Sequence, residues 1–71
     1  MTEILSPIPG VIKKVCVTDG DTIMAGEDVI ILEAMNLEMP VLSSATGVVS
    51  IHVSDGDTVD ANQLLIKVEE N

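Results

Sequence analysis

The apolar residues of this chain fall into short, β-branched runs that are separated by turn-forming Gly, Asp and Pro residues. Runs of this length and composition are typical of strands. The predicted strands cover residues 3–5, 11–17, 22–24, 28–33, 37–42, 48–54, 58–60 and 64–69. No long segment combines helical periodicity with helix caps, so we expect almost no helix.

The second half of the chain repeats the first at an offset of 36 residues. Asp19-Gly20-Asp21-Thr22-Ile23 recurs as Asp55-Gly56-Asp57-Thr58-Val59, and apolar positions on both sides follow the same offset. Each copy is too small to bury its own apolar face. We therefore expect a single domain over residues 1–71, in which halves at about 6–35 and 42–70 pack around a pseudo-two-fold axis.

A glycine marks the start of the first long strand in each half, and in the first half a proline precedes it. Pro9-Gly10-Val11 corresponds to Thr46-Gly47-Val48 after a one-residue adjustment of the offset. Pro7, Pro9 and Pro40 are predicted where a strand begins, bends or forms an edge, because proline has no N–H to donate to a sheet.

The sequence Asp-Gly-Asp occurs twice, at residues 19–21 and 55–57. A calcium loop would need further oxygen ligands at fixed spacings and a bidentate Glu, and neither copy supplies them. A turn explains both copies, because Gly20 and Gly56 provide a positive φ and Asp side chains accept bonds from nearby backbone N–H groups. We predict turns at both places.

The stretch from Glu33 to Pro40 lies between the two halves. Apolar strand sequence precedes it at residues 29–32 and follows it at residues 41–42. A short polar point between two such runs is typical of a hairpin tip, and Asn36 tolerates the left-handed backbone region. The sequence therefore predicts a central hairpin that displays residues 35 and 36.

Composition favours a small β domain in a reducing compartment. Val, Ile and Thr supply 23 of the 71 residues, and no Phe, Trp or Tyr is present. A domain of this size buries only about 60% of its unfolded surface, and the single Cys16 has no intrachain partner for a disulfide. No apolar run reaches the length of a membrane helix and no signal pattern is present, so we expect a soluble, cytoplasmic or otherwise intracellular domain without membrane insertion.

The charge of the chain argues against nucleic-acid binding. The net charge is −9, with only three Lys and Arg residues. Affinity for a phosphate backbone comes from such residues, and base stacking needs aromatic side chains. The acidity itself is typical of a domain that stays in solution among larger partners.

Cys16 and His52 invite a hypothesis of a nucleophile and its base. The repeat argues otherwise, because the two residues occupy equivalent positions in the two halves. They alternate with predicted core residues, which places both on outer faces and far from each other. We expect no catalytic site there.

The central hairpin carries a resemblance to a known family. Glu33-Ala34-Met35-Asn36-Leu37-Glu38 resembles the Glu-Ala-Met-Lys-Met-Glu hairpin of biotin carboxyl carrier domains. Ser6-Pro7-Ile8-Pro9-Gly10 resembles their Ala-Pro-Met-Pro-Gly opening, and the segments Val17 to Asp21 and Thr46-Gly47-Val48 resemble their turn and second half. The related lipoyl domains show Asp-Lys-Ala at the tip, so Ala34-Met35 favours the biotinyl branch.

This resemblance implies a fold and a function. The fold would be a flattened β-barrel, or sandwich, of two four-stranded antiparallel sheets related by a pseudo-dyad. The function would be to carry biotin on the tip lysine between a biotin carboxylase and a carboxyltransferase or decarboxylase, after attachment by a biotin protein ligase. The domain itself would be non-catalytic, and tethering would hold the intermediate near both sites.

The chain departs from the family pattern where the chemistry takes place. Asn36 stands at the position of the acceptor lysine, and a carboxamide nitrogen is not a nucleophile. Lys13, Lys14 and Lys67 are predicted to be solvated side chains, none of them at the hairpin. We therefore expect no covalently bound biotin on this chain.

The rest of the hairpin keeps the features that a partner would recognise. The resemblance assigns recognition to the residues around Asn36, which are Glu33, Ala34, Met35, Leu37 and Glu38. An exposed apolar Met35 has no packing reason to exist, which favours recognition. Asn36 fits three explanations, which are a deliberate replacement, a natural loss of attachment, or a sequence that departs from the working protein at this one position. The alternative function is a non-biotinylated structural or docking module on the same fold.

Overall fold

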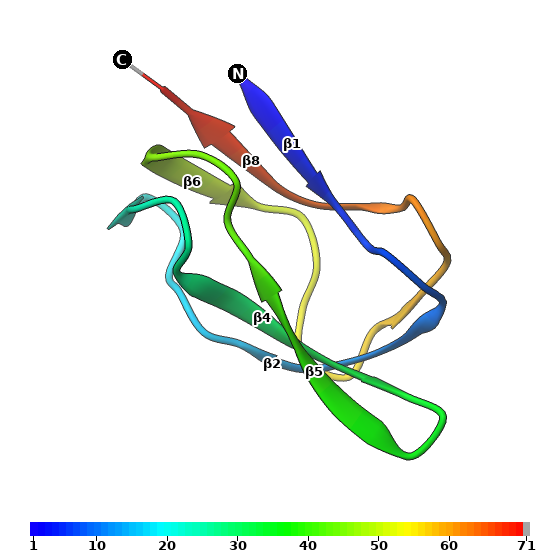
Figure 1. Ribbon diagram of the computed structural model, residues 1–71. Helices are drawn as coiled ribbons and strands as arrows, with labels where there is room; N and C mark the ends of the chain where they lie inside the picture. The colour runs from blue at the N-terminus through cyan, green and yellow to red at the C-terminus, as the bar shows by residue number, and fades with distance from the viewer. Residues whose placement is uncertain (71) are drawn as a thin grey trace.

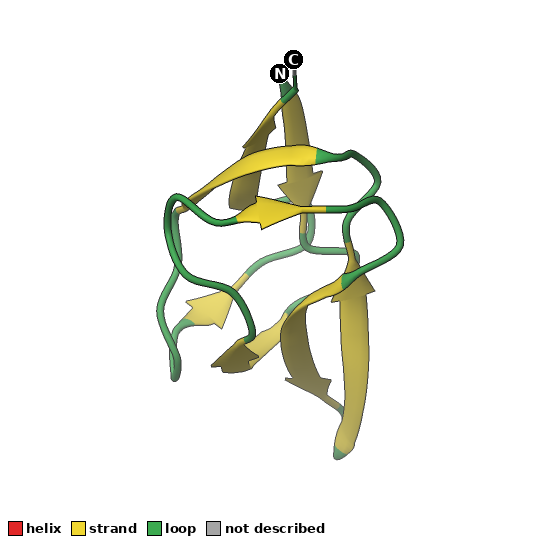
Figure 2. Ribbon diagram, turned by 90° about the vertical axis from the view of Figure 1, so that its left-hand side faces the viewer, coloured by secondary structure: helices red, strands yellow, loops and turns green. Residues whose placement is uncertain are grey.

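The computed structural model describes residues 1–70, which contain eight strands and no helix. No helix able to span a membrane is therefore found among these residues. The strands are β1 (Thr2–Leu5), β2 (Gly10–Val15), β3 (Thr22–Ile23), β4 (Asp28–Ala34), β5 (Leu37–Leu42), β6 (Gly47–Ile51), β7 (Thr58–Val59) and β8 (Leu64–Glu69). They form two four-stranded antiparallel sheets, which confirms the predicted all-β fold (Figure 2).

The internal repeat of the sequence is also a repeat of topology. One sheet has the order β1-β8-β6-β3 and the other has the order β5-β4-β2-β7. Strands four places apart in the chain therefore hold the same place in the two sheets. Because β3 joins the sheet of β6 and β8, while β7 joins the sheet of β2 and β4, neither half forms a sheet alone.

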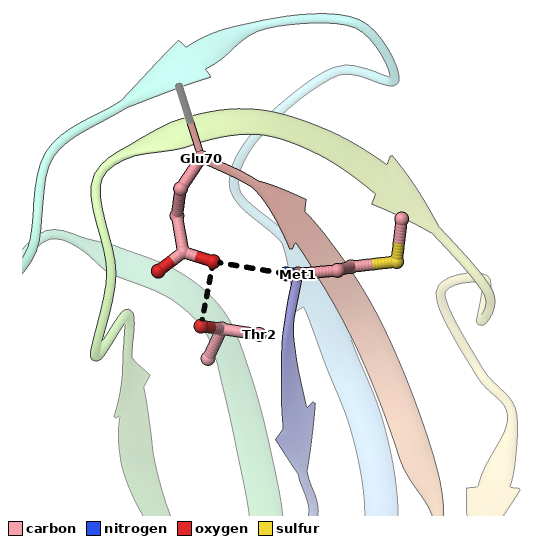
Figure 3. Close-up of polar contacts among 3 residues, drawn as sticks. All are labelled: Met1, Thr2 and Glu70. Atoms are coloured by element: carbon pink, nitrogen blue, oxygen red, sulfur yellow. Dashed lines mark hydrogen bonds and ion pairs between the residues drawn. The ribbon is translucent and has the colours of Figure 1, made fainter.

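The two sheets make an elongated body of 36 × 18 × 18 Å. The connection between β4 and β5 lies at one end of it, and the start of β1 and the end of β8 lie together at the other end (Figures 1 and 2). At that second end, the Met1 amino group lies 3.4 Å from a Glu70 carboxylate oxygen. The Thr2 hydroxyl donates a hydrogen bond of 2.9 Å to the same oxygen, so one carboxylate contacts both of the first two residues of the chain (Figure 3).

Two long strands end earlier than the sequence predicts. The strands expected over residues 11–17 and 48–54 end at Val15 and Ile51. The reason lies in the turns that follow, because a carboxylate of each turn bonds the backbone N–H three residues before it and draws the chain out of the sheet. The Asp21 carboxylate accepts from Thr18 at 2.9 Å, and that of Asp57 accepts from Ser54 at 2.8 Å.

The first Asp of each turn joins the two halves. Asp19 accepts a hydrogen bond of 2.7 Å from the N–H of Ile51, and Asp55 accepts one of 2.8 Å from the N–H of Val15. Gly20 and Gly56 have φ values of 91° and 90°, as the turns require. The prediction of two turns at these sequences is confirmed. The Asp carboxylates accept hydrogen bonds from backbone N–H groups.

Aliphatic side chains fill the space between the sheets. The core cluster consists of Ile4, Ile12, Ile23, Val29, Ile30, Leu32, Val41, Ala45, Val49, Val53, Val59, Leu65, Ile66 and Val68. The two buried polar residues, Ser6 and Ser43, are equivalent in the two halves, and each hydroxyl donates to the carbonyl two residues further on. Every buried polar side chain among the described residues is thus satisfied.

Glycine at position 10 allows β2 to approach the end of β4. A Cβ atom added there would lie 2.6 Å from the carbonyl oxygen of Glu33 and 3.3 Å from the Cβ of Ala34. Gly47 occupies the same place in the other half, against the carbonyl of Glu69. The close approach at Gly10 supports β4 just before the chain leaves the core.

Replacing Gly10 by Ala is expected to lower the free energy of unfolding by about 1–3 kcal/mol, because the added methyl group overlaps a backbone carbonyl that cannot move freely. Urea unfolding measures the change. Ser44→Ala, at an exposed position, serves as the control and is expected to stay within about 0.5 kcal/mol. Equal stability of the Gly10→Ala variant and the original chain would contradict the tight approach.

Candidate functional site

A two-residue turn joins β4 to β5. Ala34 pairs with Leu37, and the residues between them, Met35 and Asn36, have φ values of 53° and 65°. Two consecutive positive φ values identify a type I′ turn, whose twist matches that of the strands it connects. The predicted hairpin with residues 35 and 36 at its tip is confirmed.

The tip presents apolar surface to solvent. Met35 is 90% exposed and Leu37 is 66% exposed. Leu37 continues the core-facing row of β5, yet it lies outside the core because the hairpin projects beyond the body of the domain (Figures 1 and 2). Ala34, its partner across the strands, is only 9% exposed and marks the edge of the core.

Two glutamates face each other at the base of this tip. Glu33 on β4 and Glu38 on β5 are directly opposite in the register. Like charges in this arrangement repel. A lysine from the neighbouring strand β2 lies between them, because the Nζ of Lys13 is 2.8 Å from an oxygen of Glu38 and 3.9 Å from one of Glu33.

Lys13 stays protonated in this position. The hydrogen bond from its ammonium group to Glu38, together with the negative charges of Glu38 and Glu33, raises the pKa of Lys13 above its usual value. All three side chains are about half exposed. The group is therefore a hydrated cluster of two anions and one cation on the outer face of the hairpin.

The prediction that the Lys13 side chain is solvated is confirmed, but the prediction that it lies away from the hairpin is wrong. The register of β2 against β4 shifts between Ile12 and Lys14, and Lys13 is the unpaired residue at this bulge. A bulge turns its extra side chain in a new direction. The one-residue adjustment needed to align the two halves was the sequence signal of this bulge.

Cys16 and His52 do not belong to the hairpin. Both are exposed, and the only side chain that His52 contacts by a hydrogen bond among the described residues is Ser50, at 3.4 Å. A shallow hollow of about 580 Å³ lies between the two halves, and neither residue lines it. Residues 1–70 contain no cluster of His, Cys, Asp and Glu that could hold a metal ion.

Comparison with known proteins identifies the class to which this fold and hairpin belong. The model of the biotin/lipoyl family, described as biotin-requiring enzymes, matches residues 2–68. The chain belongs to this family.

Relatives of the chain include a biotin carboxyl carrier protein and a carboxylase subunit. The chain is 45% identical over 64 residues to a biotin carboxyl carrier protein of Streptococcus mutans, an alignment that covers 89% of this chain and 49% of the relative. It is 38% identical over 65 residues to the human mitochondrial propionyl-CoA carboxylase alpha chain, covering 90% of this chain and 9% of the relative. The chain thus spans about half the length of the first relative and about a tenth of the second.

Solved structures place the fold in the same group. The urea carboxylase of Kluyveromyces lactis matches with a TM-score of 0.88 at 35% identity, covering 96% of this chain and 6% of that one. The lipoyl domain of the 2-oxoglutarate dehydrogenase complex from Azotobacter vinelandii matches with a TM-score of 0.83 at 27% identity, covering 99% and 98%. The barrel-sandwich fold expected from the sequence is confirmed.

Asn36→Gly is expected to leave the free energy of unfolding unchanged or higher, whereas Asn36→Val is expected to lower it by roughly 1–2 kcal/mol, because a β-branched residue is strained at positive φ. Thermal and urea unfolding measure both changes. Leu37→Val, one residue further along and outside the positive-φ positions, is the control. A harmless Asn36→Val exchange would rule out the left-handed turn.

Proposed function

We propose that this chain is a biotin carboxyl carrier-type domain of a biotin-dependent carboxylase or decarboxylase, and that it does not itself accept biotin. The family and the carboxylase relatives support the first part. The second part rests on one observation, which is that Asn36 occupies the second position of the exposed tip turn. In the family pattern this position belongs to the acceptor lysine.

The residues of the tip do not fit covalent attachment. Attachment needs an unprotonated amine that attacks an activated carbonyl carbon. The nitrogen of the Asn36 carboxamide shares its lone pair with the carbonyl group and cannot act in this way. Biotin is the cofactor of the family, but this hairpin lacks the group that would bind it.

None of the three lysines replaces the missing amine. Lys13 is held as an ammonium ion by Glu38 and Glu33, which removes the lone pair that a nucleophile needs. Lys14 pairs with Ile31 in the middle of a sheet, and Lys67 lies on β8 in the other sheet. Neither is displayed on a turn.

The hairpin tip is still exposed and keeps its turn, which supports a role in docking. Met35 and Leu37 expose apolar side chains at the end of the domain, where a partner can reach them without displacing the core. The expected partners are the biotin carboxylase and the carboxyltransferase or decarboxylase parts of such an enzyme, with a biotin protein ligase for a lysine-bearing form. In this role the domain is a non-catalytic component.

A second function is favoured by the same observation. A hairpin that keeps its turn and its exposed apolar residues, but has no acceptor, also suits a purely structural or docking module. Such a module would bind carboxylase subunits equally well with Asn or Lys at position 36.

Co-expression with a biotin protein ligase, followed by intact mass measurement, tests the proposal. The original chain is expected to gain no biotin, and Asn36→Lys is expected to gain one, because the exchange restores the amine on an unchanged turn. Asn36→Gln, which lengthens the side chain without an amine, is the control.

Biotin on the original chain would overturn the interpretation of Asn36. A folded Asn36→Lys variant that stays unmodified would remove the support for a carrier-type domain and favour the structural module. Co-purification of the original chain with carboxylase subunits then measures whether the unmodified domain docks.

A further inference from the structure

The two halves differ by one residue, and that residue lies beside the hairpin. In the second half β6 pairs with β8 without interruption, from Val48 opposite Glu69 to Ile51 opposite Ile66. In the first half the equivalent pairing of β2 with β4 is interrupted at Lys13. The internal symmetry of the fold is therefore broken at the strand that supports the hairpin.

The extra residue reaches across the sheet to the hairpin. The side chain of Lys13 starts on β2, passes over β4 and ends 2.8 Å from Glu38 on β5. It is the only lysine that forms an ion pair within residues 1–70. Lys14, the next residue, has the same charge and is also exposed, yet it forms none.

This contact has little value for stability. Ion pairs as exposed as this one contribute little to folding, because water screens them and two side chains must be ordered. Its effect on the surface charge is larger. Without Lys13, Glu33 and Glu38 would present two free negative charges on the outer face of the hairpin, whereas with Lys13 the cluster carries one.

A basic partner would need the same carboxylate oxygens that Lys13 contacts. Arginine and lysine side chains bind carboxylates through short, charge-assisted hydrogen bonds. An arginine or lysine from a partner would thus have to displace the Lys13 ammonium group from Glu38, or approach it against like-charge repulsion.

We propose that Lys13 is a specificity-determining residue, which occupies the place of a partner's basic side chain on the hairpin carboxylates and so disfavours partners with a basic hairpin-binding surface. This inference rests on the proposed function, in which the hairpin is the docking surface. It adds a second feature beside the same hairpin: Asn36 occupies the position of the acceptor, and Lys13 neutralises part of the charge next to it.

The test compares Lys13→Met with Lys14→Met in the chain that carries Asn36. Both variants lose one positive charge and keep a long aliphatic side chain, so their net charges are equal. The probe is a tetra-arginine peptide, whose binding is followed by the NMR amide shifts of residues 33–38. At low ionic strength the Lys13→Met variant is expected to bind roughly three- to fivefold more tightly than Lys14→Met.

Salt and a conservative variant complete the test. The difference in affinity is expected to disappear at about 0.5 M salt, where such exposed charges are screened. Lys13→Arg is expected to bind the peptide as weakly as the original chain. Equal affinities of the two methionine variants at low salt, or tighter binding by Lys14→Met, would overturn the proposal.

This outcome is independent of biotin attachment. The peptide titration uses no ligase and no lysine at position 36, so a failure of the carrier proposal shows in the mass experiment alone. Amide shifts outside residues 33–38 report whether each variant keeps the fold. Peptide binding that is confined to other parts of the domain would also overturn the role of Lys13.

Discussion

The constraint on which this structure depends is that neither half of the chain buries its own apolar side chains. The halves exchange strands, because each sheet contains two strands from each half. Asp19 and Asp55 secure this exchange, since each carboxylate bonds a backbone N–H at the end of a long strand in the opposite half. The elongated shape follows, and with it an end from which a hairpin projects.

The features that stabilise the projecting hairpin do not depend on which side chain stands at position 36. Its stability rests on a type I′ turn and on the close approach of Gly10 to the end of β4. Neither requires a lysine at position 36, and Asn suits positive φ well. The identity of that side chain can therefore change without loss of the exposed turn, which is what our proposal of a carrier-type domain without an acceptor requires.

The charges of Glu33, Glu38 and Lys13 also affect what the hairpin surface can bind. Two glutamates opposite each other on adjacent strands would repel, and the lysine between them comes from a bulge in a third strand. The free energy involved is too small to explain the bulge by stability. In our proposal its value lies in what the hairpin offers to a partner, since a carboxylate pair with half of its charge neutralised, beside an apolar tip, attracts different surfaces from those that two free carboxylates would attract.

The sequence by itself determined most of each strand, the two Asp-Gly-Asp turns and the hairpin tip at residues 35 and 36, because these depend on local periodicity and turn chemistry. The departure from the family pattern at Asn36 rests on the reactivity of one side chain and stays a prediction. The sequence did not determine where the long strands end, since that depends on carboxylates bonding backbone groups in three dimensions. Nor did it place Lys13 at the hairpin. That contact joins residues 25 positions apart in the chain, and only the register of β2 against β4, shifted by one unpaired residue, brings the ammonium group to Glu38.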